Sequence, residues 1–255
     1  IEGILKKDSA ESLLSVGMYL NVNKLDMERQ RIVEKLLRHG YYKFNKEYLS
    51  YTVDTARNTY QADLTLHLVL PKAVDGTPLQ AHRRYFINKI SFITDYDMLR
   101  SSALSSIEVN DSIHYQSFPV YYKDQLYLRP KVLVNNLYFS PGQLYDERDV
   151  QRTYTSFGRL QALKYTNIRF FEVQRNDSSL LNAYVMLTKS KHQSISFELE
   201  GTNSAGDLGA AASVSFQHRN LFKGSESFMF KLRGAYEAVS GLQGNYRNED
   251  YTELG

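Results

Sequence analysis

The sequence predicts an α+β protein in which two similar units precede a set of long antiparallel strands. Two observations predict this fold class. A helix, a turn and two strands follow one another twice within residues 1–191, and such a duplication is hard to obtain by chance. From residue 192 onward, apolar and polar residues alternate over runs of about ten, the pattern of strands with one apolar face.

Composition sets the outer limits of this interpretation. The 255 residues are 42% hydrophobic, enough for one or two domains with real cores, and 20 Tyr and 13 Phe suit a β-rich protein. Cysteine is absent, which excludes disulfides, thiolate metal sites and cysteine catalysis. A formal net charge of +3 is too small and too evenly spread to indicate nucleic-acid binding. No apolar run reaches the roughly 18 residues of a membrane helix and no signal peptide opens the chain, which we expect to be a fragment of a longer protein.

The first unit is expected to contain a weakly patterned helix over residues 8–19 and a strongly patterned helix after it. Asn23 or Asp26 can cap the second helix, and Gly40 supplies its left-handed stop. The apolar side of this helix comprises Leu25, Ile32, Val33, Leu36 and Leu37. Its polar side comprises Glu28, Arg29, Arg31, Glu34 and Lys35.

Two strands complete the first unit, over residues 48–53 and 62–70, with residues 54–59 as the turn between them. An opening strand is missing or reduced to residues 1–7. Residues 71–84, which hold an Asp-Gly pair and a proline, form the best linker in the chain.

The second unit begins with a strand over residues 85–94. The Tyr-rich passage that follows, residues 95–130, is irregular in pattern, and its aromatic residues fit either a peptide-binding groove or the core of an extra hairpin. A helix is predicted over residues 146–163, because apolar residues recur there at steps of four and three. Strands over residues 166–173 and 181–188 follow the helix.

Three consecutive strands are predicted between His192 and Gly234, with a short turn after the second. The apolar face of the third strand comprises Phe228, Phe230, Leu232, Gly234 and Tyr236. Alternation alone fits both the wall of a membrane barrel and one sheet of a soluble sandwich, because both place apolar side chains on one face only.

The amino-acid sequences of two segments resemble those of a known family. A strand that ends in Glu-Gly-Thr-Asn at 200–203, followed by a Gly-rich strand that ends in Asn-Leu-Phe-Lys-Gly-Ser-Glu at 220–226, resembles the start of the barrel in BamA-type outer-membrane assembly proteins. That family carries periplasmic POTRA repeats before its barrel. The segment Gly-Tyr-Tyr-Lys-Phe at 40–44 resembles the connection from helix to strand in those repeats.

The resemblance implies α+β POTRA repeats of order β-α-α-β-β, with two helices on one face of a small mixed three-stranded sheet. The opening strands of an antiparallel transmembrane β-barrel would follow them. The implied segments are an N-terminally truncated repeat over 1–72, a linker over 73–84, a second repeat over 85–191 with an insertion at about 95–130, and barrel strands over 192–255. The family's Arg-Gly-Phe-type motif, borne on a barrel loop, is absent from this sequence.

The resemblance also implies a function without enzymatic activity. The chain would belong to an assembly and insertion factor of the Gram-negative outer membrane, with its repeats in the periplasm. A sheet with an open strand edge can pair with an extended segment of another chain, which suits binding of unfolded barrel precursors by β-augmentation. The implied partners are unfolded outer-membrane protein precursors, accessory outer-membrane lipoproteins and outer-membrane lipid, with no cofactor and no nucleic acid.

Two sets of residues carry this implied function. The candidate client-binding edge residues are Leu49, Tyr51, Val53, Ile168, Phe170 and Val173. The first barrel strand would form a lateral seam at which a client hairpin enters. The candidate seam residues are Ser194, Ile195, Ser196, Phe197, Glu198, Leu199 and Glu200.

Two other functions stay open. A related POTRA-barrel protein could serve translocation or secretion of a dedicated partner, and a soluble multi-domain scaffold could use the C-terminal strands as a sandwich. Catalytic and metal motifs are not found, because the six histidines lack metal-ligand spacing and no nucleophile elbow or phosphate loop occurs. Asp95-Tyr96-Asp97 is the acidic pair that could hold a metal, and a solvated turn is the better interpretation.

Overall fold

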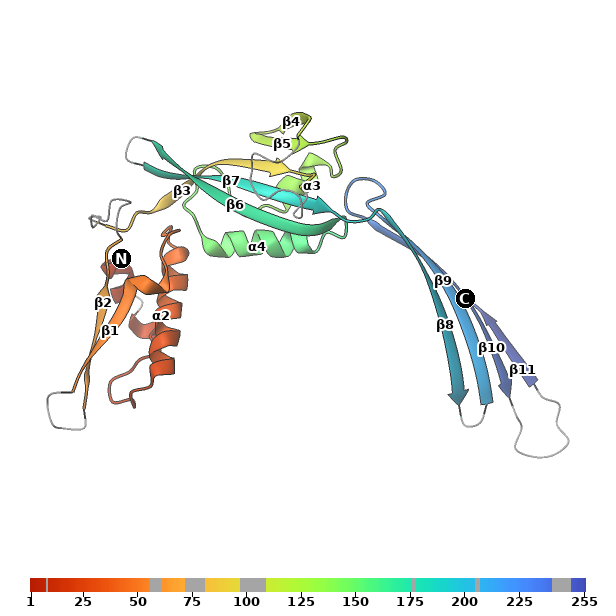
Figure 1. The fold of residues 1–255 in the computed structure, drawn as a ribbon, viewed down its shortest axis with the longest axis horizontal. Coiled ribbons are helices and arrows are strands. Elements are labelled where there is room, and N and C mark those ends of the chain that lie inside the picture. The colour runs from red at the N-terminus through yellow and green to blue at the C-terminus, as the bar shows by residue number, and fades with distance from the viewer. Residues whose placement is uncertain are drawn as a thin grey trace.

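The computed structural model describes residues 1–7, 9–55, 61–71, 81–96, 109–175, 178–204, 207–239 and 249–255. Its strands form three sheets that follow one another along the length of the molecule (Figure 1). Among the residues described, two strands belong to the first unit, five to the second and four to the C-terminal sheet. The α+β class predicted from the sequence is therefore confirmed.

The first unit is a helix packed on a hairpin. Its elements are α1 (Glu2–Lys7), η1 (Ser9–Glu11), α2 (Val22–Leu37), η2 (Lys46–Tyr48), β1 (Leu49–Asp54) and β2 (Asp63–Leu68). β1 and β2 pair antiparallel, with Leu49 opposite Leu68. The buried core comprises Ile32, Val33, Leu36, Tyr41, Phe44 and Leu49. The patterned helix and both strands of the prediction are confirmed, whereas the implied three-stranded sheet has two strands among the residues described.

The beginning of the first unit differs from the prediction. Residues 1–7, expected as a reduced strand, form α1, and in residues 9–19 the only helical element is η1. The cause is tertiary, because Ser12 and the backbone of Leu13 bind the carboxylate of Glu28. Glu28 was expected on the polar side of α2 but is only 3% exposed. These contacts hold the segment against α2 in place of helical hydrogen bonds.

The predicted N-cap of α2 is wrong, whereas the predicted glycine stop after α2 is confirmed. The N-cap is Asn21, and not Asn23 or Asp26, because its side chain accepts the backbone N–H of Asn23 at 2.9 Å. Gly40 has φ +89°, the left-handed conformation expected after the helix. The chain therefore leaves α2 where the sequence indicates.

The second unit is a mixed five-stranded sheet with helices packed on it. Its elements are β3 (Tyr85–Ile93), β4 (Asp111–Tyr115), β5 (Phe118–Tyr122), α3 (Pro130–Asn135), α4 (Glu147–Gly158), β6 (Leu163–Arg175) and β7 (Ser178–Lys189). The strand order is β4-β5-β3-β7-β6, with β3 parallel to both of its neighbours. Helix α4 lies along the sheet beside β6 (Figure 1). The largest fully buried side chains of this unit include Ile87, Ile90, Phe92, Phe139, Phe157, Leu181 and Leu187.

The Tyr-rich passage resolves one alternative left open by the sequence. Residues 111–122 form the hairpin β4–β5, whose Phe118 and Val120 are buried in the core, so the extra-hairpin interpretation is confirmed. Residues 97–108 of this passage lie outside the described residues, as does most of the predicted linker. The helix predicted to end at 163 ends at Gly158, and α3 was not predicted. Ala162 and Leu163 already belong to the turn and strand that follow, because α4 must end for β6 to pair with β7.

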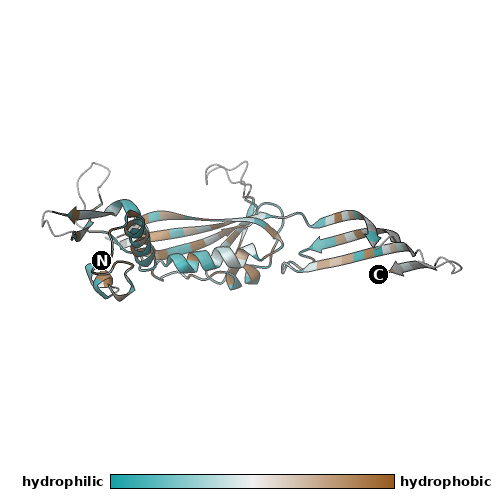
Figure 2. Cartoon of the chain, turned by 90° about the horizontal axis from the view of Figure 1, so that it is seen from below, coloured by the Kyte–Doolittle hydropathy of each residue, from teal (hydrophilic) through white to brown (hydrophobic). Residues whose placement is uncertain are grey.

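The C-terminal sheet consists of β8 (Gln193–Ser204), β9 (Asp207–Arg219), β10 (Ser227–Val239) and β11 (Glu249–Leu254), in the order β11-β10-β9-β8. All neighbours pair antiparallel. The three predicted strands and the turn after the second are confirmed, and β11 was missed. Figure 2 shows apolar and polar residues alternating along these strands. Over the described ranges, none of the helices combines the length and the apolar character needed to cross a membrane.

Candidate functional site

The C-terminal sheet has one apolar face that is open to its surroundings. Residues directly opposite one another in antiparallel strands share a face, so Ile195, Phe216 and Phe230 form one row across β8, β9 and β10. The next rows are Phe197, Val214 and Leu232, then Leu199, Ala212 and Gly234. Phe197 is 76% exposed and Leu199 is 88% exposed. A continuous apolar face of this kind marks a surface that contacts another apolar phase or partner.

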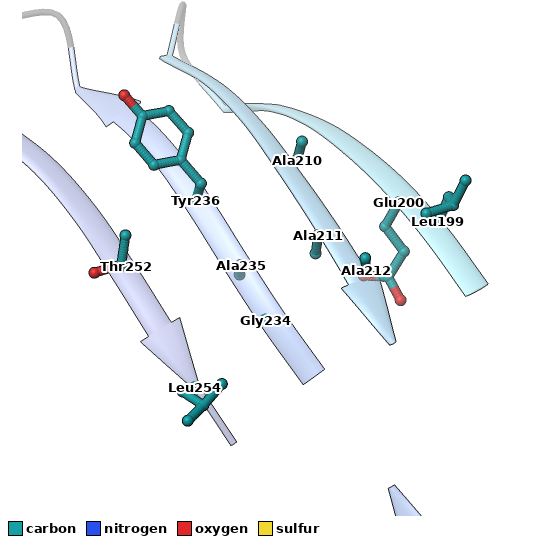
Figure 3. A pocket seen from close by; sticks show the side chains of 10 residues that line it. All are labelled: Leu199, Glu200, Ala210, Ala211, Ala212, Gly234, Ala235, Tyr236, Thr252 and Leu254. Carbon is teal, nitrogen blue, oxygen red and sulfur yellow. The ribbon is translucent and has the colours of Figure 1, made fainter. Parts of the chain in front are cut away.

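The same face carries a shallow hollow. Small residues of β9 and β10 leave space there between the larger side chains Leu199, Tyr236 and Leu254 (Figure 3). The small residues that line it are Ala210, Ala211, Ala212, Gly234 and Ala235. Its polar lining residues are Thr252 and Glu200, and the carboxylate of Glu200 is paired with Arg233.

The opposite face of the sheet is polar and is held by ion pairs. Lys231 of β10 reaches Glu198 of β8 at 2.8 Å, and Arg233 reaches Glu200 at 2.9 Å. Both pairs cross β9 at Ala211, Ser213 and Ser215, which are small, and the hydroxyl of Ser213 donates to Glu198 at 3.0 Å. The sheet therefore separates an apolar face from a charged one, as the alternation in its sequence predicts.

The candidate seam residues lie together on β8. This strand is last in the order of its sheet, so one of its edges has no neighbouring strand in the part of the chain that the structure describes. Its apolar residues Ile195, Phe197 and Leu199 lie on the open face, and Glu198 and Glu200 are tied to β10. The structure thus brings all seven predicted residues to one edge, and their role as a seam stays a prediction.

The candidate edge strand β6 is also last in its sheet, but its edge is partly occupied. The backbone N–H of Ile168 donates to the hydroxyl of Tyr154 on α4 at 2.8 Å, and that hydroxyl donates to the carbonyl of Ile168 at 3.3 Å. The side chains of Ile168 and Phe170 pack in the core, and Val173 is half-buried. The predicted side chains of this strand are therefore not free to bind another chain, and pairing would use its backbone.

The candidate edge of the first unit is β1. Leu49 is buried in the core, whereas Tyr51 and Val53 are half-buried on the same face. Burial, together with the nearby charge of Glu28, raises the pKa of Tyr51 to about 12. As in β6, the predicted side chains support the core, and the backbone edge is the part that remains available.

An aromatic cluster joins the two units. The ring of Tyr42 contacts Tyr85, Tyr145 and Phe170, with ring centroids 5.0 to 5.7 Å apart. Gly40 accepts the backbone N–H of Tyr85 at 2.8 Å. Burial and the neighbouring carboxylate of Glu172 raise the pKa of Tyr85 to about 12. Residues 40–44 therefore hold the two units together through a packed contact.

A second junction joins β9 and β10 to the second unit. The turn of residues 220–226 begins at Asn220, whose side-chain amide donates to the carbonyl of Tyr127 at 2.8 Å. Arg129 donates its backbone N–H to the carbonyl of Lys223 at 2.8 Å, and Ala162 donates its own to the hydroxyl of Ser225 at 3.0 Å. This role was not predicted from the sequence. The structure shows that Asn220, Lys223 and Ser225 all take the left-handed backbone, and of these three residue types Asn favours it.

The acidic pair suggested by the sequence has a structural contact. Asp95 accepts the backbone N–H of Lys123 at 2.9 Å and forms an ion pair with Lys189 at 3.0 Å. The Asp95 side chain is only 8% exposed whereas that of Lys189 is 47% exposed, so the expected solvated turn is corrected to a buried carboxylate paired with an exposed lysine. Asp97 lies outside the described residues. Within those residues, no group of three or more His, Asp or Glu side chains is placed to hold a metal ion.

Comparison with known proteins yields a likeness of fold. No protein-family model and no curated protein matches the sequence. Among solved structures, BamA from Haemophilus ducreyi lacking POTRA domains 1–3 is similar with a TM-score of 0.56 and 13% identity, over 91% of this chain and 36% of that chain. The chain thus spans little more than a third of that BamA structure.

Two further solved structures are less similar in fold. BamA POTRA3-5 from Haemophilus influenzae has a TM-score of 0.42 and 13% identity, over 72% of this chain and 57% of that chain. CdiB from Acinetobacter baumannii has a TM-score of 0.39 and 10% identity, over 93% of this chain and 36% of that chain. The likeness to the Haemophilus ducreyi structure confirms the resemblance to BamA-type proteins at the level of fold.

Proposed function

We propose that this chain belongs to a BamA-type protein of the outer membrane that assembles or inserts other outer-membrane proteins without enzymatic activity. The two α+β units would lie in the periplasm as POTRA repeats, and β8 to β11 would open a membrane barrel. The observation that carries the proposal is the C-terminal sheet. Its apolar face is exposed, and two ion pairs join β8 to β10 on its polar face. The fold likeness to BamA supports it.

The open edges suggest how clients would be bound. β6 ends its sheet, and its neighbour β7 already pairs with it antiparallel, so an added strand would extend an existing ladder. Pairing through backbone groups tolerates many sequences, which suits clients of varied sequence. The edge of β8 would accept a client hairpin in the same way, because an unpaired strand edge in hydrocarbon is strongly unfavourable. Accessory lipoproteins would bind elsewhere on the periplasmic units.

The test uses extended client peptides with two complementary patterns of backbone N-methylation. An edge strand pairs with every second residue of an added strand, so methyl groups on one alternate set should abolish binding and those on the other set should not. Fluorescence anisotropy of labelled barrel-derived peptides with the folded protein measures this. Equal binding of both methylated peptides would exclude β-augmentation. Binding of a single soluble exported protein, with no affinity for barrel peptides, would favour secretion in place of assembly.

A further inference from the structure

We propose that the turn between β9 and β10, residues 220–226, is an anchor at the membrane surface. Its apolar residues Leu221 and Phe222 would enter the lipid interface, and the cations around it would bind anionic lipid headgroups. The inference rests on the proposed function, because it requires the C-terminal sheet to lie in a membrane. It assigns a lipid contact to the same turn that holds the second unit.

The first observation is the exposure of two large apolar side chains in a turn. Leu221 is 48% exposed and Phe222 is 62% exposed, at a position where tight turns normally carry small polar residues. Phe228, on the apolar face of β10 one pair away from the turn, is also 52% exposed. Exposed apolar groups at the end of a membrane strand are typical of the lipid interface.

The second observation is that the turn has a fixed conformation. Asn220, Lys223 and Ser225 have φ values of +70°, +58° and +67°, although none of them is glycine. The carboxylate of Glu226 accepts the backbone N–H groups of Phe222 at 3.2 Å and Gly224 at 3.1 Å. Backbone hydrogen bonds hold the pKa of Glu226 below its usual value, so the carboxylate stays charged in this role. A fixed turn presents its apolar side chains at a small entropic cost.

The third observation is the charge around the turn. Arg129 donates its backbone N–H to the carbonyl of Lys223 at 2.8 Å, so two exposed cationic residues meet at the turn. The carboxylate of Glu226 is bound to backbone N–H groups of the turn. Long cationic side chains can keep their apolar stems in lipid and their charges among headgroups. An anionic lipid surface is therefore the partner that the turn fits.

The consequence is a fixed position for the second unit. The turn binds that unit through Tyr127, Arg129 and Ala162 on one side, and Leu221 and Phe222 would bind lipid on the other. The second unit, and with it the edge of β6, would then be held at the membrane surface.

The experiment uses tryptophan as a reporter, because the 255 residues contain none. Phe222→Trp, Phe230→Trp on the sheet face and Tyr138→Trp on the second unit are each reconstituted as the full-length protein in phosphatidylcholine vesicles containing phosphatidylglycerol. Signals are corrected with the protein that lacks the reporter. Insertion into the lipid interface should blue-shift the emission of Phe222→Trp, and lipids brominated near the headgroup should quench it, whereas Tyr138→Trp, at a position that is 50% exposed, should be unaffected.

A comparison of quenchers tests the charge. At equal mole fraction, brominated phosphatidylglycerol should quench Phe222→Trp several-fold more efficiently than brominated phosphatidylcholine. The double reversal Arg129→Glu with Lys223→Glu should abolish that preference, since each cation near a membrane contributes about fivefold. Lys24→Glu, an exposed cation on α2, is the matched control and should leave the preference unchanged.

The outcomes separate this inference from the proposed function. Quenching of Phe230→Trp without quenching of Phe222→Trp would contradict the proposed membrane anchor at residues 220–226 but would still support a C-terminal sheet in the membrane. If brominated lipids quench neither Phe222→Trp nor Phe230→Trp, both the anchor and the membrane location of the C-terminal sheet are contradicted. Equal quenching by the two lipids would overturn the binding of anionic headgroups.

Discussion

A single buried carboxylate holds the N-terminal segment on α2. Glu28 accepts the hydroxyl of Ser12 and the backbone N–H of Leu13, each at 2.9 Å, and the guanidinium of Arg31 at 2.8 and 2.9 Å. Burial by itself would raise the pKa of Glu28, but the hydrogen bonds from Arg31, Leu13 and Ser12 outweigh it and hold the pKa below its usual value. The charged carboxylate is therefore the form that stabilises this segment.

We expect Glu28→Gln to lower the free energy of unfolding by about 1–3 kcal/mol, because charge-assisted hydrogen bonds are lost in a buried site. Since the folded pKa is lowered, the contribution of Glu28 is present above the usual carboxyl pKa and is lost as pH falls through the folded value. Urea unfolding between pH 7 and pH 3 should show the two proteins converging in acid. Glu34→Gln, an exposed position on α2, should have little effect, and a pH-independent difference for Glu28→Gln would contradict the assignment.

Glycine at position 40 is required by two independent constraints. Its φ is +89°, and a Cβ built there would lie 2.5 Å from Cδ1 of Leu144 in the second unit. Gly17 has φ +85° with no atom within 4 Å of such a Cβ. The pair of glycines therefore separates the cost of backbone conformation from the cost of the contact between the units.

We expect Gly17→Ala to cost about 1–2 kcal/mol of stability from the left-handed backbone alone. Gly40→Ala should cost more, because Leu144 must also move and the aromatic contact of Tyr42 with the second unit loosens. Chemical denaturation of both variants measures the difference. Equal losses would show that the contact with Leu144 can relax freely.

At the scale of elements, each edge of the five-stranded sheet is used differently. The hairpin β4–β5 pairs with β3 on one side, which covers the β3 edge and leaves β6 at the other end. The hydroxyl of Tyr154 on α4 binds the outward N–H and carbonyl of Ile168 in the middle of β6. An added strand would have to displace that hydroxyl to pair along the whole edge.

We expect Tyr154→Phe to bind extended client peptides about three- to tenfold more tightly, because the competing hydrogen bonds to Ile168 are removed. The same substitution should slightly destabilise the second unit. Peptide titration by fluorescence anisotropy measures the affinity, and Tyr138→Phe, at an exposed ring, serves as the matched control. Unchanged affinity for Tyr154→Phe would indicate that clients pair elsewhere.

At the scale of the whole molecule, two junctions set the arrangement of the three sheets in Figure 1. The first is the aromatic cluster around Tyr42, and the second is the turn that begins at Asn220. Asn220 is only 5% exposed and combines a left-handed φ with hydrogen bonds to Tyr127 and Ser225. It therefore links the C-terminal sheet to the second unit by its side chain.

We expect Asn220→Gly to keep the left-handed backbone but to broaden the distribution of distances between the second unit and the C-terminal sheet. Spin labels on Thr155→Cys of α4 and Ser196→Cys of β8 report that distance by double electron–electron resonance, and the 255 residues offer no native cysteine. Asn203→Gly on β8 is the control. An unchanged distribution for Asn220→Gly would place the rigidity of the junction elsewhere.

The sequence by itself determined the periodic elements and the faces they present. Helix α2 and strands β1, β2, β3 and β6 to β10 follow from alternation or helical spacing, because these patterns state directly which side of an element is apolar. The candidate seam residues lie together on β8 for the same reason, since they are contiguous in one strand. The predicted segment boundaries over the chain remain predictions.

Only the tertiary structure decided how these elements compete for one another's polar groups. Three hydrogen bonds join residues that are distant in the sequence: Ser12 to the buried Glu28, Ile168 of β6 to Tyr154, and Asn220 to Tyr127. Periodicity reports only local position and does not predict them. The short β4–β5 hairpin and η1 were likewise decided by what they pack against. A pattern determines which face of an element is apolar, but hydrogen bonds between elements determine which of the polar groups remain open to a partner.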